Sequence, residues 1–356
     1  MKLKPETDKF KPINTLARKI KGMDSITRIP KVYENGRKDV PRPRSRSVFT
    51  SSHANDDLPT RDIVRYEGQA SRPLYVPKPI TVKNYFSEEY NDAYTDDGYS
   101  GGTIISPQGI ITMHLREYIR VDLSLDRAIR ISNAKNGIVL ALSASGSSSG
   151  LIHPNGRVYQ YGSRVEIMAN DNHGNNKFAK MWYKGVSFTS VQCALVYLVD
   201  SAGTRTTTDT FNDLTHDFTL NIFYEDSPYS YLDTPNTTHT THLVNEAMNV
   251  LQATNCWMTE DGTTNWIINN VRISQTADGL VRVGRNSNKF SLRTSPTNGS
   301  ASVSSPYMHC TGSMGQTRHL FVRRGERRMH YDGSTFIVRN AGHSAGFDEK
   351  HQLKVY

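Results

Sequence analysis

The chain has 356 residues with 36% hydrophobic content, which is enough for two ordinary domains and a tail. No long apolar run follows the charged N-terminus or occurs elsewhere, which argues against secretion and against a membrane span. A net charge of +9 and three scattered cysteines without a C-x-x-C pair indicate an intracellular, soluble protein with an acidic partner.

Residues 1–102 are predicted to form an extended arm, because nine of the 15 prolines fall within the first 80 residues. The whole net charge lies in residues 1–46, which contain 14 Lys or Arg and 5 Asp or Glu, whereas the rest of the chain contains 29 of each. We expect the arm to bind an acidic partner through its basic residues Arg18, Lys19, Lys21, Arg37, Lys38, Arg42, Arg44 and Arg46. Its apolar residues are expected to fill separate pockets on a neighbouring protein: Ile13, Leu16, Ile20, Phe49 and Tyr75. A solvated tail without a dedicated partner is the alternative.

Residues 103–255 are predicted to form a β-sheet module that ends in a helix. Apolar and polar residues alternate in 121–126, and 138–142 and 194–199 are short apolar runs typical of central strands. With an Asn-Gly hairpin at 155–156 and a last strand at 218–223, the pattern predicts a meander of seven or eight strands. Residues 243–251 then place their apolar side chains on one helical face.

Residues 256–356 are predicted to form a second β-rich module. Asp-Gly turns at 261–262, 278–279 and 332–333 stand beside runs of β-branched residues. The predicted fold is therefore mainly β (α+β), with antiparallel sheet modules and a connecting helix. Two related sheets or one larger sheet both fit this pattern.

Three motifs that suggest chemistry have simpler explanations. Gly146–Gly150 matches G-x-S-x-G, but a hairpin follows it where a nucleophile elbow needs a helix, so we interpret it as a turn. His239 and His242 have helical spacing but no companion ligands, and no phosphate-binding or dinucleotide-binding loop occurs. We therefore expect no enzyme activity, no cofactor, no metal and no small-molecule substrate.

Two basic clusters stand out. Residues 42–47 combine arginines with Ser45 and Ser47, and phosphorylation there would weaken an electrostatic contact. Residues 323–328 contain four arginines near a predicted hairpin turn. We interpret the second cluster as a solvated edge that discourages strand pairing, in preference to a contact patch.

Two segments resemble a known family. Residues 151–158 resemble the HPNG hairpin of glutamate-rich ciliary and testis proteins, and residues 199–207 are similar to the ADGTRITT strand of those proteins and of the sperm-associated antigen of the axonemal central apparatus. The resemblance covers residues 140–225 and departs at Ser201-Ala202, where the family has Ala-Asp. It implies a non-catalytic, polo-box-like sheet that is used for assembly in cilia and flagella.

The first interpretation is a structural component of the ciliary or flagellar axoneme, in sperm, within the cytoplasm and cytoskeleton. Its arm would thread along acidic tubulin or a neighbouring axonemal protein, with an affinity that falls as salt rises. The alternative is a capsid-like or nucleic-acid-binding protein with a basic arm and a β-rich shell domain. No membrane partner is expected. The sequence does not identify the acidic partner or the oligomeric state, and it does not decide whether the two β modules form one domain.

Overall fold

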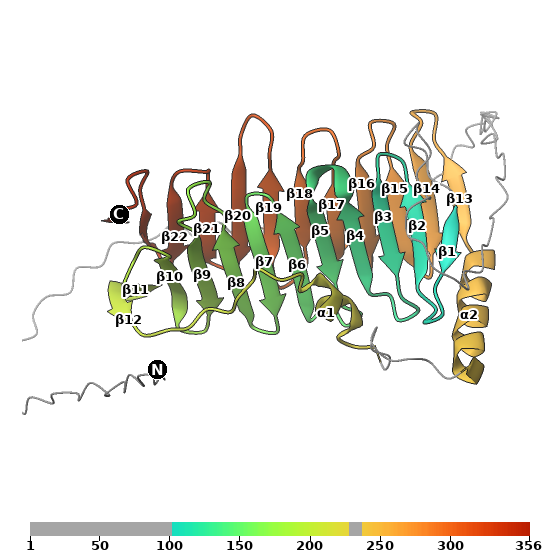
Figure 1. The fold of residues 1–356 in the computed structure, drawn as a ribbon, viewed down its shortest axis with the longest axis horizontal. Helices are drawn as coiled ribbons and strands as arrows, with labels where there is room; N and C mark the ends of the chain where they lie inside the picture. The colour runs from blue at the N-terminus through green and yellow to red at the C-terminus, as the bar shows by residue number, and fades with distance from the viewer. Residues whose placement is uncertain (1–101, 228–236) are drawn as a thin grey trace, which may run out of the picture. The chain divides into compact units, whose positions relative to one another are not determined.

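The computed structural model describes residues 102–227 and 237–356, without the side chains of 237–239, and in these ranges the chain is mainly β (Figure 1). The first sheet has twelve antiparallel strands in sequential order. They are β1 (Thr103–Ile105), β2 (Ile111–Leu115), β3 (Ile119–Leu123), β4 (Ile129–Asn133), β5 (Ile138–Leu142), β6 (Ser148–His153), β7 (Gly156–Tyr161), β8 (Arg164–Ala169), β9 (Lys177–Trp182), β10 (Gly185–Ser190), β11 (Val196–Asp200) and β12 (Gly203–Thr207).

The second sheet repeats this plan with twelve more antiparallel strands, again in sequential order. They are β13 (Asn255–Met258), β14 (Thr264–Ile268), β15 (Val271–Gln275), β16 (Val281–Arg285), β17 (Phe290–Thr294), β18 (Ala301–Ser304), β19 (His309–Ser313), β20 (His319–Arg324), β21 (Arg327–Tyr331), β22 (Phe336–Asn340), β23 (His343–Phe347) and β24 (Leu353–Val355). The predicted fold class, mainly β with antiparallel sheets, is confirmed.

The predicted count of seven or eight strands in the first sheet is wrong, because several turns lack the usual turn residues. Tyr183-Lys184 joins β9 to β10, and the φ of +142° at Gly185 provides the change of direction. Glu117 and Tyr118 turn the chain between β2 and β3 at φ values of 61° and 57°, which side chains other than Gly, Asn and Asp seldom adopt. The Glu117-Tyr118 turn therefore contains no Gly or Asn, and the glycine of the other hairpin, Gly185, stands outside the two-residue loop at the start of β10.

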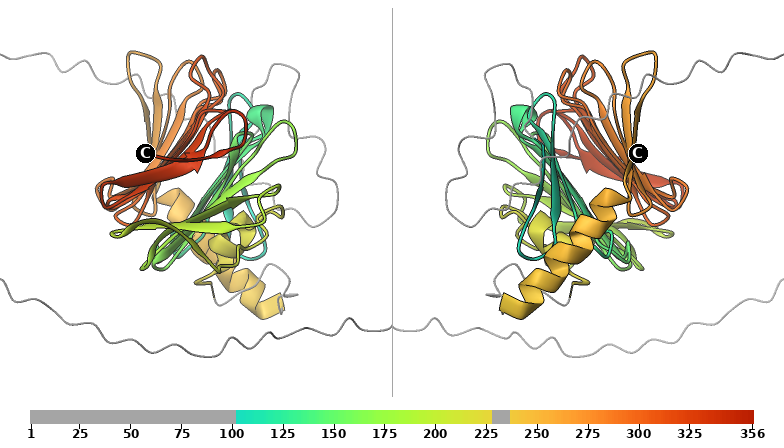
Figure 2. Two further views of the ribbon diagram at one scale, coloured as in Figure 1. Left: turned by 90° about the vertical axis from the view of Figure 1, so that its left-hand side faces the viewer. Right: turned by 90° about the vertical axis from the view of Figure 1, so that its right-hand side faces the viewer.

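The two sheets lie face to face and share one core (Figure 2). Along each strand, alternate residues point inward and are buried, as in Ile111–Leu115 and Val271–Gln275. Each fully buried aliphatic side chain of this core contributes about 1.5–3 kcal/mol relative to exposure. The predicted modules thus correspond to two layers, and the predicted boundary at 255/256 falls within β13.

Side-chain amides at the strand ends fasten one layer to the other. Asn155 Nδ2 donates to Ser313 O at 2.6 Å, and Asn340 Nδ2 donates to Val199 O at 3.1 Å. Gln275 Nε2 donates to the carbonyl of Arg116 at 2.9 Å. Each amide bonds a backbone carbonyl of the other layer, so these contacts fix the alignment of the sheets.

The α-helices cover different parts of the slab. The predicted helix is confirmed as α2 (Thr237–Gln252), which lies at the β1 end and buries Leu243, Ala247 and Leu251. The predicted last strand at 218–223 is wrong, because Thr219–Tyr224 forms helix α1. Phe218 and Ile222 are four residues apart and both lie against Gly150 on the outer face of the first sheet. One helical turn brings such residues within about 6 Å of each other, whereas a strand would separate them by about 13 Å.

Neither described helix has the length and apolar character of a membrane span.

Candidate partner-binding surfaces

The predicted partner-binding residues of the arm lie outside the described residues, so their role stays a prediction. Ser45, Ser47 and the side chain of His239 also lie outside the described part of the chain, so the phosphorylation of the two serines stays a prediction. The imidazole of His242 is exposed on α2, and no group of three or more His, Cys, Asp or Glu side chains within 102–227 and 240–356 is arranged to hold a metal ion.

The G-x-S-x-G segment forms a turn followed by a strand. Gly146 adopts a φ of +79° in the turn, and Ser148 is the first residue of β6 with its side chain buried. The hairpin of β6 and β7 follows, so the serine is not displayed between a strand and a helix. The structure therefore supports the interpretation of this motif as a turn.

The hairpin at 153–156 differs in detail from the predicted Asn-Gly turn. Pro154 and Asn155 form the two-residue loop, while His153 pairs with Gly156 at the strand ends. Gly156 has a φ of +149°, and a Cβ there would lie 2.2 Å from the carbonyl oxygen of Met168. The glycine is needed because the neighbouring strand β8 approaches so closely.

Ionisable groups on the outer face of the first sheet hold down the strap, the segment 208–218 that leads to α1. Lys180 Nζ contacts Asp209 Oδ1 at 2.8 Å, and Glu166 Oε2 accepts a hydrogen bond from Asn212 N at 2.8 Å. Burial would raise the pKa of Asp209, but the hydrogen bonds from Lys180, Ser187 and Thr210 N and the charge of Lys180 together outweigh it, so the pKa is lowered and the carboxylate stays charged. These charges are used to attach the strap to the sheet.

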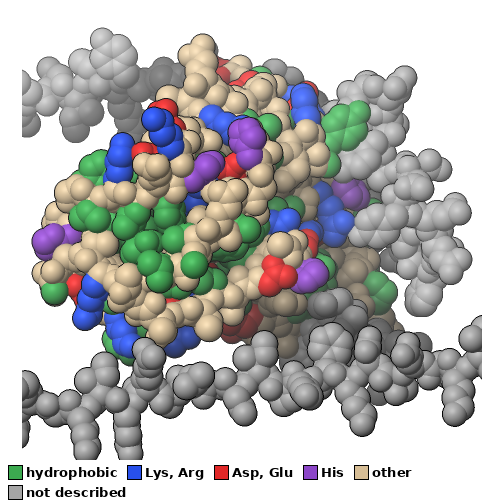
Figure 3. Space-filling model, turned by 60° about the vertical axis from the view of Figure 1, so that its left-hand side comes forward, with side chains coloured by type: hydrophobic (Ala, Val, Ile, Leu, Met, Phe, Trp, Pro, Cys, Tyr) green, Lys and Arg blue, Asp and Glu red, His purple; other side chains and the backbone are tan. Residues whose placement is uncertain are grey.

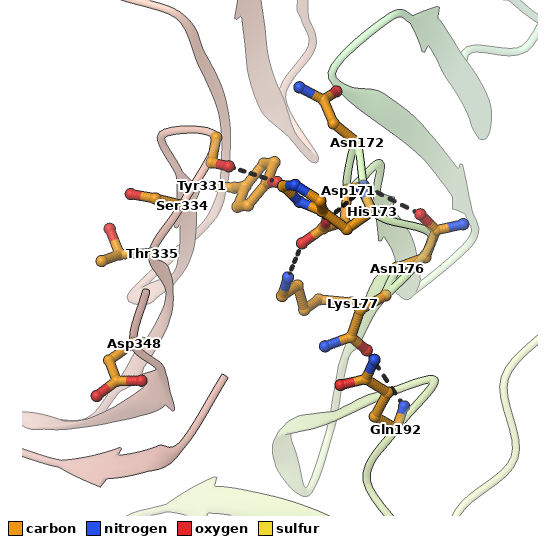
Figure 4. A network of polar contacts seen from close by, with 12 residues as sticks. Asp171, Asn172, His173, Asn176, Lys177, Gln192, Tyr331, Ser334, Thr335 and Asp348 are labelled. Atoms are coloured by element: carbon orange, nitrogen blue, oxygen red, sulfur yellow. Dashed lines mark hydrogen bonds and ion pairs between the residues drawn. The ribbon is translucent and has the colours of Figure 1, made fainter. Parts of the chain in front are cut away.

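A second buried ion pair lies between the sheets, where the loop after β8 meets β21 (Figure 4). Lys177 Nζ contacts Asp171 Oδ2, and the two side chains are 0% and 4% exposed. The Lys177 ammonium lies 5.8 Å from the ring centroid of Tyr331, whose hydroxyl donates to Gly333 O at 2.9 Å. Burial raises the pKa of Tyr331 to about 12, so its phenol stays neutral. The network ties the loop to the second sheet.

The outer face of the second sheet has a different character. All seven carboxylates of residues 255–356 lie in hairpin turns, whereas six arginines point outward from the strands and are exposed. These are Arg272, Arg282, Arg293, Arg323, Arg328 and Arg339. No described carboxylate lies within ion-pair distance of any of the six. Figure 2 shows no described helix crossing this face, which we call the arginine face.

The strand register aligns these arginines in two rows that cross the strands. The first row contains Arg272, Gly284, Ser291, Ser304, His309, Arg323, Arg328 and Arg339 as successive cross-strand partners. The second row contains Ser274, Arg282, Arg293, Ser302, Thr311, Phe321, His330 and Ile337. Three arginines are consecutive in the first row and two in the second.

The cluster at 323–328 is therefore divided between the two sides of the sheet. Arg323 and Arg328 belong to the arginine face, while Arg324 and Arg327 are half-buried and point to the other side. Arg327 Nη2 donates to the carbonyl of Tyr183 in the first sheet at 3.4 Å. The segment lies in strands β20 and β21 in the middle of the sheet, so its interpretation as a solvated edge is wrong.

A depression of about 360 Å³ lies on the arginine face over β15 to β18. Its lining includes Arg272, Arg282, Arg293, Asn288 and several serines. Two imidazoles on the same face have lowered pKa values: burial is the main cause for His309 and His330, and arginine neighbours contribute to both. The face therefore presents guanidinium, hydroxyl and neutral imidazole groups to solvent.

The end of the slab near β12 and β24 is apolar and open. Both strands are sheet edges, and apolar side chains gather on the side that Figure 3 brings forward. Leu353 and Val355 belong to the inward-facing series of β23 and β24 but are 38% and 60% exposed. Leu195 and Tyr356 are also exposed at this end.

Comparison with solved structures finds similar chains with low scores. The TCP10 domain of Danio rerio CPAP in complex with a peptide of Danio rerio STIL matches at 8% identity and a TM-score of 0.23, over 69% of this chain and 98% of that chain. The SAS-4 (dCPAP) TCP domain in complex with a proline-rich motif of Ana2 (dSTIL) of Drosophila melanogaster matches at 8% identity and a TM-score of 0.16, over 67% and 89%. We draw nothing about function from similarity at this level.

Comparison with curated proteins finds no match. The family model described as "Domain of unknown function (DUF8796)" matches residues 103–353, which include almost every described strand. The chain therefore belongs to the DUF8796 domain family.

Proposed function

We propose that the protein is a non-catalytic scaffold of the ciliary or flagellar axoneme that docks on an acidic protein surface. The observation that carries the proposal is the filled, two-layer slab, in which the buried ion pairs of Lys177 and Lys180 attach a loop and the strap to the sheets. A rigid slab of this kind offers long faces for partners.

The basic segment 1–46 supports an acidic partner, because it contains the whole net charge of the chain. The resemblance of residues 140–225 to ciliary and sperm proteins supports the axonemal setting, with tubulin or a neighbouring axonemal protein as the partner. The capsid-like alternative has less support, because a jelly roll interleaves its strands whereas both sheets here follow the sequence order.

Co-sedimentation with microtubules tests this proposal. We expect the full chain to pellet with microtubules at low salt, and we expect the bound fraction to fall as salt rises or when residues 1–46 are deleted. Pelleting that is insensitive to both changes would contradict the arm-mediated contact. An ultraviolet absorbance shoulder from co-purified nucleic acid would instead favour the nucleic-acid alternative.

A further inference from the structure

The arginine face is expected to lower the stability of the folded protein, because like charges lie opposite one another on it. Arg282 is directly opposite Arg293, and Arg328 is directly opposite both Arg323 and Arg339. Like charges at directly opposite positions destabilise a sheet, and the described chain places no carboxylate within ion-pair distance of them, although Asp278 acts on Arg293 at longer range. Arg272 lies over the Trp257 ring and Arg323 donates to Gly325 O, but no such contact within the described chain accounts for the opposed residues Arg282, Arg293, Arg328 and Arg339. An anionic ligand would account for them.

The choice of arginine narrows the chemistry of that ligand. Its planar guanidinium binds a carboxylate or a phosphate through two parallel hydrogen bonds, which a lysine ammonium cannot do. All six exposed cations of the two rows are arginines. The hydroxyl groups of Ser291 and Ser302 lie beside the arginines in the two rows and add further donors, whereas Thr311 Oγ1 is hydrogen-bonded to His319 Nε2.

The rows also set the shape of the ligand. Neighbouring strands are about 4.8 Å apart, so the seven steps from Arg272 on β15 to Arg339 on β22 span roughly 34 Å. An extended polypeptide covers that distance with about ten residues. A long, thin polyanion lying across the strands therefore matches the rows better than a compact ligand does.

A polypeptide fits this surface better than a nucleic acid. Single-stranded nucleic acids bind on stacking aromatic rings, and among Phe, Tyr and Trp the outward positions of β13 to β22 provide only Trp257 and the half-buried Phe321, seven strands apart. Sequence-specific duplex readers insert a helix or ribbon into a groove, and the arginine face is a flat sheet without such a projection.

We propose that the arginine face binds an extended, glutamate- or aspartate-rich segment of another protein. This inference rests on the acidic partner of the proposed function and adds a second binding site, on the folded part of the chain and separate from residues 1–46. The carboxylates of the segment lie along the two rows, with the triplet Arg323, Arg328 and Arg339 and the pair Arg282 and Arg293 as the main contacts.

The test measures the fluorescence anisotropy of a labelled ten-residue glutamate peptide titrated with the full chain. We expect Arg282→Ser/Arg293→Ser and Arg328→Ser/Arg339→Ser each to weaken binding about tenfold, which corresponds to about 1.4 kcal/mol. The matched control Arg164→Ser/Lys184→Ser removes two exposed cations near hairpin turns of the first sheet and should change affinity less than twofold. Both arginine double variants should keep or raise the melting temperature, because like-charge pairs are removed.

Equal affinities of the control and the two arginine variants would overturn the inference. Tighter binding of a ten-nucleotide oligothymidylate than of the glutamate peptide, lost in the same two variants, would overturn the choice of a polypeptide. A chain without residues 1–46 separates this site from the proposed function. If that chain still binds the peptide through the arginine face but pellets with microtubules unchanged, the arm contact fails while this inference stands.

Discussion

Replacing Asp171 by asparagine is expected to destabilise the protein strongly, because it leaves the ammonium of Lys177 buried without a counter-charge. The Lys177 side chain is fully buried, and Asp171 is its ion-pair partner. Breaking a buried pair in this way costs about 3–5 kcal/mol. For an ordered region of this size, the melting temperature should fall by roughly 6–20 °C.

Asparagine is a suitable replacement because it preserves the shape of the side chain. Its amide oxygen can still accept the hydrogen bond that Asp171 receives from His173 N at 2.7 Å, so the loop keeps that contact. The double variant Asp171→Asn/Lys177→Met removes both charges and should recover most of the lost stability. Thermal unfolding followed by circular dichroism of the full chain measures all three proteins.

The same pair has a predictable pH dependence. Burial would raise the pKa of Asp171, but the hydrogen bonds from Lys177 and from His173 N, together with the charge of Lys177, outweigh it, so its pKa in the folded protein is lowered. Its contribution to stability is therefore present above the unfolded pKa of about 3.9 and is lost as pH falls through the folded pKa. The difference between the wild type and Asp171→Asn should narrow in that acid range. A cost below about 1 kcal/mol at pH 7, or additive effects in the double variant, would refute this reasoning.

Two further predictions concern the arginine face and a turn. Burial and arginine neighbours lower the pKa values of His309 and His330, so both imidazoles are neutral near pH 7.5. Binding of the glutamate peptide should therefore tighten as pH falls toward 5.5, and His309→Gln/His330→Gln should remove this change. A pH profile of this double variant that matches the wild type would contradict the prediction. Gly156→Ala should cost about 3 kcal/mol, since its Cβ would collide with the backbone of β8, whereas Gly162→Ala, with open space around it, should cost about 1–2 kcal/mol. Equal melting temperatures of the two glycine variants would contradict this assignment.

The sequence predicted the elements whose signals are local. Alternating or continuous apolar runs identified strands such as 138–142. The helical spacing of apolar residues identified α2, which stands between the two strand-rich segments in the sequence. It failed at 218–223, where six apolar and polar residues fit either a strand or a helix turn, and the packing of Phe218 on the sheet decided for the helix. Hairpins without Gly or Asn in the two-residue loop, such as Tyr183-Lys184, were not predicted, because the loop itself contains no residue typical of turns.

The sequence by itself determined that the chain is β-rich, because strands and turns give local patterns, and that its excess positive charge lies in residues 1–46, because charge can be summed along the chain. Only the tertiary structure decided that the two sheets form one slab and that six arginines of residues 255–356 gather on one side of it. Arg282, Arg293, Arg328 and Arg339 are irregularly spaced in the sequence, and their alignment depends on the register of successive hairpins. Residues 255–356 contain 13 Lys or Arg and seven Asp or Glu, and all seven carboxylates lie in the turns. The outward side of these strands is therefore left with arginines once the strands pair.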